Sequence, residues 1–518
     1  MGVIEIKWQA FVIFLILFLL VTVLGFYAAR WKRGDLDLLD EWGLGGRRFG
    51  TVITWFLLGG DLYTAYTFIA VPALVYGVGA FGFFAVPYTI VLYPIMFVVM
   101  PRLWRVCKVH SFVTPSDFVK ARFDSRSMSL AVAITGILAT MPYIALQLVG
   151  IQAVLVAMGF TSTGALKDLP LFVAFAILAA YTYTSGLRAP ALTAVVKDIL
   201  IYATVIVAVI VIPTKLGGFT HIFAVSQTAL IAKKGSLILT PKLYGAFASI
   251  ALGSAFALLL YPHVITGTLG AKSGRTIERN AALLPLYSVA LALLALLGYM
   301  AIAAGIKTSV SSEVVPLLLI KTLPEWFVGI AFAAIAIGAL VPAAIMSIAA
   351  ANLFSRNIYK DFFKPEATTQ DEAKVAKIVS LIVKLGALLF VVIIPLKYAI
   401  YLQTLGGIWI LQTGPAIIGG LWTRWFHKKA LLIGWAVGMI WGTYMAYTLK
   451  FASSTYPLHI FGRTELGYAA VWAVIANLIL VVVLSAIFNA AKLPNGVDKT
   501  SASDYLPQAQ TPTELQPN

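Results

Sequence analysis

Long apolar runs dominate the chain and predict membrane-spanning helices. Most of these runs reach the roughly 20 residues that an α-helix needs to cross a hydrocarbon core about 30 Å thick. Charged or Gly- and Pro-rich breaks separate them, and the pattern predicts an all-α membrane protein with about thirteen transmembrane helices. The predicted spans are 8–30, 50–78, 80–104, 127–158, 170–184, 192–213, 246–266, 281–306, 327–354, 376–395, 399–422, 430–450 and 467–488.

The amino-acid composition also indicates a protein that lies mostly in the lipid bilayer. Hydrophobic residues make up 60% of the chain and charged residues 11%, whereas soluble domains average about 45–50% apolar and about 25% charged. The first run begins at Trp8 and has no small-residue cleavage site, which predicts a retained span and not a signal peptide. The single cysteine, Cys107, excludes an intramolecular disulfide framework. We expect a multi-pass protein of the cell membrane.

The charge of the loops predicts an orientation. Lys and Arg cluster after the first, third and ninth runs, and cytoplasmic loops carry an excess of such residues. Lys233 and Lys234, after the sixth run, oppose this trend. The balance predicts an N-outside, C-inside chain whose formal charge of +17 faces membrane lipids and not nucleic acid. The polar segment 491–518 is expected to be a disordered cytoplasmic tail.

Two of the predicted spans are interrupted by Gly and Pro. Unwound backbone at membrane depth is tolerated only where it lines a cavity or is buried in protein, so such interruptions indicate a central binding site. Helix packing contacts are the alternative explanation, but matching positions in the two halves favour a site. The interruptions are Gly59-Gly60 and Pro72 in the run 50–78, and Gly253-Ser254 and Tyr261-Pro262-His263 in the run 246–266.

Three polar stretches carry a resemblance to a known family. They are Thr-Pro-Ser-Asp-Phe at 114–118, Gly-Leu-Arg at 186–188, and the segment 343–361 from Ala-Ala-Ile-Met-Ser to Asn-Ile-Tyr-Lys-Asp. Together they resemble the sodium:solute symporter family over nearly the whole chain apart from the tail. The runs 59–66 (Gly-Gly-Asp-Leu-Tyr-Thr-Ala-Tyr) and 347–352 (Ser-Ile-Ala-Ala-Ala-Asn) look most like its monocarboxylate permease branch.

This resemblance implies a LeuT-type fold and a secondary active symporter. It implies an extra helix at 1–34, two inverted repeats of five helices at 45–215 and 245–425, and two further helices at 428–490. No catalytic pair, phosphate loop or metal-ligand spacing is present in the sequence, so we expect no enzyme and no cofactor.

The resemblance also implies where a sodium ion would bind. Its ligands align with the carbonyls of Gly60, Tyr63 and Ala344 and with the hydroxyl of Ser347. A second hydroxyl is expected at position 348, where this chain has Ile348. A hard cation needs oxygen ligands, and an alkyl group supplies none.

Lys197, which precedes Asp198, offers a substitute for sodium. Burial makes the charged form of a lysine costly, so its proton can come and go and couple transport to a proton gradient. Lys197 snorkelling to the cytoplasmic interface, or pairing statically with Asp198, remains open. We therefore expect H⁺ coupling, with Na⁺ coupling as the alternative.

Asp61 is another ionisable residue predicted at membrane depth. It follows Gly59-Gly60, where an unpartnered carboxylate would be costly. It is a candidate for the coupling ion site, for a cap on the second half of the broken helix, and for a static ion pair.

The predicted substrate is a small organic anion. Free N–H groups and the positive dipole at half-helix N-termini favour a carboxylate, which suits a monocarboxylate such as lactate, pyruvate or acetate. Another small solute, such as an amino acid, is the alternative. Interhelical hydrogen bonding is the competing role for each polar candidate. The candidates are Tyr63, Thr64, Tyr66, Tyr143, Gln147, Ser254, Trp409 and Gln412.

Overall fold

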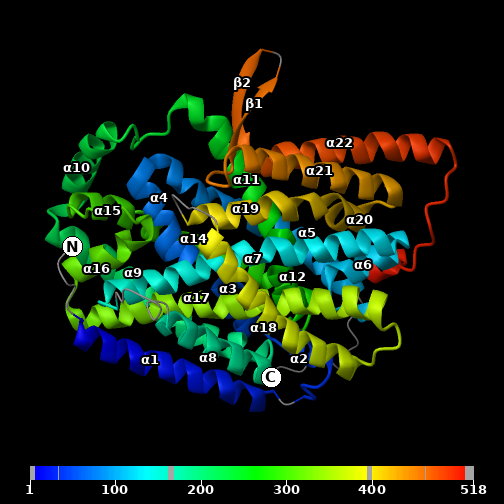
Figure 1. Ribbon diagram of the computed structural model, residues 1–518, viewed down its shortest axis with the longest axis horizontal. Coiled ribbons are helices and arrows are strands. Elements are labelled where there is room, and N and C mark those ends of the chain that lie inside the picture. The colour runs from blue at the N-terminus through cyan, green and yellow to red at the C-terminus, as the bar shows by residue number, and fades with distance from the viewer. Residues whose placement is uncertain (1–5, 33, 161–168, 394–398, 461, 508–518) are drawn as a thin grey trace.

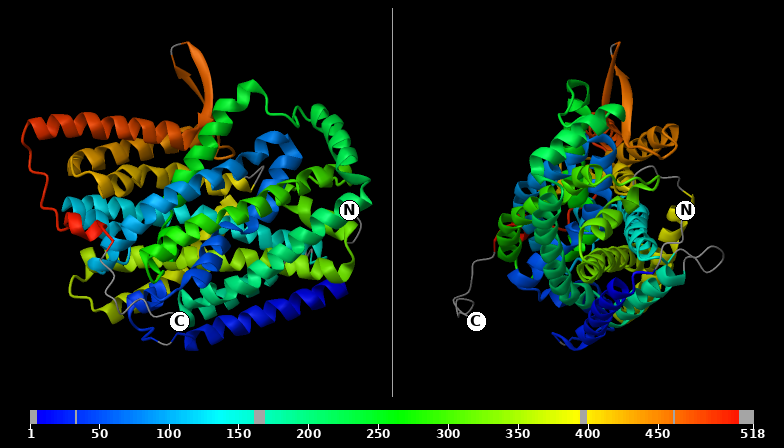
Figure 2. Two further views of the ribbon diagram at one scale, coloured as in Figure 1. Left: turned by 180° about the vertical axis from the view of Figure 1, so that it is seen from behind. Right: turned by 90° about the vertical axis from the view of Figure 1, so that its left-hand side faces the viewer.

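The structure is a computed structural model that describes residues 6–32, 34–160, 169–393, 399–460 and 462–507. Across these residues it is a helical bundle with one antiparallel hairpin, β1 (Thr455–Ile460) and β2 (Arg463–Tyr468). Most helices run along the long axis of the molecule, so the two membrane faces lie at its left and right ends in Figure 1 and exchange sides in the left panel of Figure 2. The chain is an all-α, multi-pass membrane protein.

Every predicted span falls on a helix or on a group of consecutive helices. Ten helices of the described residues are long and apolar enough to cross a membrane, and one bent pair raises the number to eleven. The run 170–184 lies on α8, whose described apolar part is shorter, and the end of the run 376–395 lies outside the described residues. The count of thirteen spans and the orientation stay predictions.

The helices have the following bounds. They are α1 (Trp8–Tyr27), α2 (Leu39–Leu44), α3 (Thr51–Leu62), α4 (Val71–Val78), α5 (Ala85–Val109), α6 (Pro115–Phe123), α7 (Arg126–Ala157), α8 (Leu169–Ser185), α9 (Arg188–Lys215), α10 (Gly218–Ala232), α11 (Tyr244–Leu260), α12 (Pro262–Leu269), α13 (Gly274–Leu283), α14 (Pro285–Ala295), α15 (Leu297–Ala303), α16 (Val314–Thr322), α17 (Glu325–Phe354), α18 (Thr369–Ile393), α19 (Ile400–Ile410), α20 (Gly420–Trp422), α21 (Lys428–Thr448) and α22 (Ala469–Ala490).

The first helix break separates α3 from α4. The chain leaves the helix at Tyr63, which has φ −104° and ψ 95°, and resumes as a π-helical turn over Tyr66–Ala70 before α4. The two halves meet at an angle of 41°. Pro72, expected as part of the interruption, instead lies at the start of α4, directly after the π-helical turn.

The second break separates α11 from α12. Tyr261 is extended, with φ −58° and ψ 133°, because the residue before a proline is driven out of the helical region. Pro262 then opens α12. Gly253 and Ser254, expected as part of this interruption, lie inside the continuous helix α11. Gly253 allows close packing there, since a Cβ on it would come within 2.6 Å of Val471.

The helix α17 forms the centre of the bundle. It is buried along almost its whole length and packs against α7, α1, α9 and α18. Its sequence is rich in Ala and Gly, which let neighbouring helices approach closely. α17 also contacts α3 and α12, so it touches one helix of each break.

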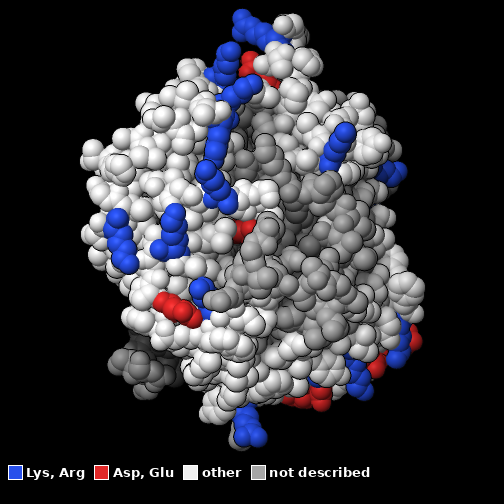
Figure 3. Space-filling model, turned by 60° about the vertical axis from the view of Figure 1, so that its left-hand side comes forward, with Lys and Arg blue, Asp and Glu red and all other residues white. Residues whose placement is uncertain are grey.

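A helix occupies the loop after the sixth predicted span. α10 packs against α15 and ends beside Lys233. Figure 3 looks toward this end of the molecule and shows Lys and Arg spread over it with few Asp or Glu. Basic residues therefore occur at this end as well, as Lys233 and Lys234 indicated.

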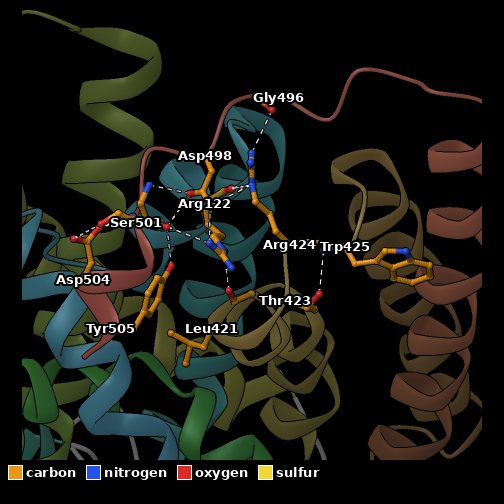
Figure 4. A network of polar contacts seen from close by, with 12 residues as sticks. Arg122, Leu421, Thr423, Arg424, Trp425, Gly496, Asp498, Ser501, Asp504 and Tyr505 are labelled. Atoms are coloured by element: carbon orange, nitrogen blue, oxygen red, sulfur yellow. Dashed lines mark hydrogen bonds and ion pairs between the residues drawn. The ribbon is translucent and has the colours of Figure 1, made fainter. Parts of the chain in front are cut away.

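The tail does not follow the prediction of a disordered segment over residues 491–507. After α22 the chain descends along the right-hand end of the molecule in Figure 1 and docks beside α6. The guanidinium of Arg122 pairs with Asp498 at 2.5 Å, and Arg424 lies 3.3 Å from the same carboxylate (Figure 4). Tyr505 packs under Arg102, with the guanidinium carbon 4.7 Å from the ring centroid. Residues 508–518 lie outside the described residues.

We call the docked segment 495–505 the strap. Its backbone is fixed to the bundle as well, since Lys499 N–H donates to the Ala121 carbonyl at 3.0 Å. His110 and Asp504 form a further contact at 2.7 Å. The low apolar content that predicts disorder is offset here by ion pairs, a buried tyrosine and cation–π contacts.

Candidate functional site

The ammonium of Lys197 lies at the first helix break. It donates hydrogen bonds to the carbonyls of Gly60 and Tyr63, both at 3.0 Å, and its side chain is completely buried. These are the two backbone oxygens that the family resemblance assigns to sodium. A carboxylate oxygen of Asp198 lies 2.6 Å from the same nitrogen. The Lys197 side chain therefore does not extend to the membrane interface. Its ammonium connects α9 to the unwound end of α3 through these hydrogen bonds.

Two glycines make this approach possible. A Cβ on Gly60 would lie 3.1 Å from the Lys197 Nζ, and a Cβ on Gly59 would lie 2.3 Å from the ring of Tyr287. The hydroxyl of Tyr287, from α14, donates to the second carboxylate oxygen of Asp198. Gly59-Gly60 thus makes room for both groups, in addition to weakening the helix.

On α17 the predicted sodium ligands are less complete. The Ser347 hydroxyl donates to the Ala344 carbonyl at 2.9 Å, within its own helix. Ile348 is fully buried beside them and contributes only alkyl groups. This side offers fewer oxygens to a cation than the resemblance implies.

A second pair of ionisable residues joins the two breaks. Asp61, in the last turn of α3, lies 3.8 Å from the Nε2 of His263, in the first turn of α12. Both side chains are buried, and neither carboxylate oxygen nor either ring nitrogen has a hydrogen-bond partner among the described residues. Asp61 does not cap the second half of its helix.

Other side chains cap that half-helix instead. Gln147 accepts a hydrogen bond from the backbone N–H of Ala65 at 3.2 Å, and the Thr64 hydroxyl accepts one from Tyr66 N–H at 3.0 Å. The Thr67 hydroxyl accepts the N–H of Thr64. The N–H groups expected to bind a substrate carboxylate are therefore occupied by protein oxygens.

Tyrosines surround the Asp61–His263 pair. The Tyr143 ring meets the His263 ring edge-on, with centroids 5.4 Å apart. The electrostatic neighbours of the Tyr143 hydroxyl include Asp61 and Tyr66. The hydroxyls of Tyr66 and Tyr143 are buried and have no hydrogen-bond partner in the described part of the chain. Tyr63 packs its ring against Tyr287, with centroids 4.7 Å apart.

Among the described residues, three of the predicted substrate residues make no hydrogen bond with the Asp61–His263 pair or with the tyrosines around it. Trp409 donates to the Thr443 hydroxyl at 3.1 Å, on α21. Gln412 exchanges hydrogen bonds with Asn477 and Ala470, on α22. Both therefore face the extra C-terminal helices. Ser254 is buried inside α11, several residues before the second break at Tyr261. Its hydroxyl has no hydrogen-bond partner within the described residues.

Two residues of the site escaped the sequence reasoning. Tyr287 belongs to no recognised motif, and nothing in its spacing from Asp198 predicts their contact. His263 enters the sequence analysis only as part of the interruption Tyr261-Pro262-His263, and not as a candidate ligand. A proline in front of it was the available signal, since it fixes the start of a half-helix at the break.

Comparisons with known proteins agree with this architecture. The profile described as "Sodium:solute symporter family" matches residues 42–442. A monocarboxylate transport permease protein from Rhizobium johnstonii is 53% identical, covering 94% of this chain and 98% of its own. An uncharacterized symporter from Bacillus subtilis is 34% identical, covering 92% and 93%.

A solved structure supports the fold. A Na⁺-coupled sialic acid symporter superposes with a TM-score of 0.72 at 17% identity, covering 93% of this chain and 98% of its own. The bundle with two helix breaks is therefore a LeuT-type fold, as the family resemblance implied. The family profile matches more than half of the chain, and the Rhizobium johnstonii relative is 53% identical over nearly its whole length. The chain belongs to the sodium:solute symporter family and is a membrane symporter of small solutes.

Proposed function

We propose that this symporter imports small monocarboxylates together with protons, and that Lys197 takes the place of the sodium ion. The observation that carries this proposal is the Lys197 ammonium, 3.0 Å from each of the carbonyls of Gly60 and Tyr63 and buried in the bundle. Ile348, in place of a hydroxyl ligand, supports the same conclusion.

The proton would control the contact between α9 and the first break. A charged ammonium holds the two carbonyls and Asp198 together, and charge-assisted hydrogen bonds contribute about 1.5–3 kcal/mol each. A neutral amine loses most of this attraction, so α9 and α3 separate more readily. Binding of the proton from outside and its release inside would then follow the opening of one face and the other.

The substrate class rests on the Rhizobium johnstonii relative and on the donors near the breaks. That relative is named a monocarboxylate transport permease and aligns over nearly its full length. The hydroxyls of Tyr66 and Tyr143 are donors that a carboxylate accepts.

Sodium coupling is the second candidate, favoured by the family itself. It requires Ser347 and backbone oxygens to hold the ion while Lys197 has moved away. The two mechanisms differ in which gradient drives transport.

The test is uptake of labelled lactate into proteoliposomes. An inward proton gradient and an inward sodium gradient are compared at clamped membrane potential, and protein-free liposomes are subtracted because protonated weak acids permeate alone. Accumulation driven by the proton gradient supports the proposal. Accumulation driven by sodium, and unaffected in Lys197→Met, would overturn it.

A further inference from the structure

The Asp61–His263 pair has no part in the lysine mechanism. The two residues come from different half-helices and approach to 3.8 Å, which is too long for a hydrogen bond. Both oxygens of Asp61 and both ring nitrogens of His263 are buried without hydrogen-bond partners among the described residues. The hydroxyls of Tyr66 and Tyr143, close by, share this property.

Six unpaired polar atoms in one place call for a partner outside the chain. Most buried polar atoms in proteins are hydrogen-bonded, and each exception has a cause such as an absent ligand. The residues come from the two helix breaks and from α7, in a LeuT-type bundle that opens alternately to either face. A ligand reaches them when one of the faces is open.

The chemistry of these atoms defines the ligand. Tyr66 and Tyr143 supply hydroxyl donors, and a neutral His263 supplies one N–H. Asp61 as a carboxylate only accepts, and it would repel a second carboxylate placed directly against it. The complementary ligand therefore has a carboxylate at one end and a hydrogen-bond donor at the other.

We propose that Asp61 and His263 recognise the 2-hydroxyl group of a 2-hydroxymonocarboxylate. The hydroxyl donates to Asp61 and accepts from the His263 N–H, while the substrate carboxylate lies toward the hydroxyls of Tyr66 and Tyr143. Asp61 is a specificity-determining residue, since a simple carboxylic acid offers it no donor. This inference rests on the proposed function only in taking the substrate to be a monocarboxylate.

The test compares lactate with propionate, which has the same carbon skeleton without the hydroxyl. Uptake of each is measured in proteoliposomes for the wild-type protein, Asp61→Asn and Asp61→Leu, with the monodisperse fraction of each purified variant as a check on folding. Wild-type kcat/KM is expected to favour lactate by about 10- to 100-fold, the discrimination that one hydrogen bond to a charged group provides. Pyruvate, which has no donor at C2, is expected to behave like propionate.

The variants separate recognition from coupling. In Asp61→Leu the preference for lactate is expected to fall below about 3-fold while propionate uptake persists, and Asp61→Asn should lie between. Equal transport of lactate and propionate by the wild-type protein would overturn the inference and leave the proposed function standing. The inference would also be overturned if a folded Asp61→Asn variant transported neither lactate nor propionate, or if the preference for lactate appeared only with sodium. In both cases Asp61 would bind the coupling ion and not the substrate hydroxyl. Failure to transport any monocarboxylate would overturn the proposed function, and this inference with it.

Discussion

Two buried pairs of ionisable residues meet at the first helix break, and they differ in how the protein treats them. Lys197 and Asp198 are surrounded by partners: two carbonyls, each other at 2.6 Å, and the Tyr287 hydroxyl. Asp61 and His263 have none within hydrogen-bonding distance among the described residues. A pair whose partners belong to the protein holds helices together, whereas a pair without partners is available to a ligand.

The two pairs are also close to each other. Lys197 donates to the Gly60 carbonyl, and Asp61 is the next residue along the chain. Lys197 and Asp61 therefore adjoin the same segment of the first break, each in its proposed role.

The largest effect is expected from removing the lysine charge. Lys197→Met leaves Asp198 buried without its cation, and breaking a buried ion pair costs about 3–5 kcal/mol. Proton-driven accumulation of lactate should fall by at least about 100-fold. Lys384→Met is the matched control, because Lys384 is also buried, and among the described residues its ammonium donates to the Ser380 carbonyl of its own helix at 3.3 Å. Equal losses in both variants would contradict the assigned role.

A sodium site should be recoverable by restoring its missing oxygen. Lys197→Ala with Ile348→Ser vacates the ammonium position and adds a hydroxyl beside Ser347. Sodium at 100 times its Kd would stabilise this double variant by about 2.7 kcal/mol. Thermal unfolding in sodium chloride is compared with choline chloride. Stabilisation of the wild-type protein by sodium would show that the lysine does not replace the ion.

A moderate effect is expected from Tyr287→Phe. The substitution removes the hydroxyl that donates to Asp198, and such a bond contributes about 1.5–3 kcal/mol, so lactate uptake should fall about tenfold or more. Tyr202→Phe is the control, because the Tyr202 ring also contacts Tyr287 while its hydroxyl has no hydrogen-bond partner within the described residues. Uptake rates are measured at saturating and at limiting lactate for both variants, and equal losses in Tyr287→Phe and Tyr202→Phe would contradict the role of the Tyr287 hydroxyl.

The smallest effect is expected at the strap, far from both pairs. Burial alone would raise the pKa of Asp504, but hydrogen bonds from the Ser501 backbone, His110 and the Ser501 hydroxyl outweigh it and lower the pKa below its ordinary value. The carboxylate therefore contributes stability above the unfolded pKa of about 4, and the contribution is lost as pH falls through the folded pKa.

This predicts a pH-dependent difference between the wild-type protein and Asp504→Asn. The difference in thermal stability should be below about 1 kcal/mol, constant above about pH 5, and should vanish at lower pH. Lactate uptake at neutral pH should be unchanged. A large loss of uptake in Asp504→Asn would show that the strap takes part in transport.

Local sequence signals predicted much of the fold. Apolar runs predicted the helices, and Pro262 predicted the second break because the residue before a proline is driven out of the helical region. Gly59-Gly60 predicted the first break approximately, since both glycines lie in α3 just before the chain leaves the helix at Tyr63. The family resemblance identified Gly60 and Tyr63, and the residues in this sequence pointed to Lys197. The structure brings these three together, and their role stays a proposal.

Other features depend on packing between distant parts of the chain. The approach of Asp61 to His263, and of Asp198 to Tyr287, is set by how whole helices lie against each other. Helical periodicity did not reveal that Gln412 faces α22 and not the centre. The strap has the composition of a disordered segment, and only the position of Arg122 and Arg102 on the bundle explains its docking.

Direct measurement of proton movement tests the central claim. Proteoliposomes loaded with a pH-sensitive dye receive external lactate at constant external pH, and the rate of internal acidification is read against protein-free liposomes. The lysine mechanism predicts lactate-driven acidification above that background without sodium, and its loss in Lys197→Met but not in Lys384→Met. Lactate entry that requires sodium and moves no protons would contradict it.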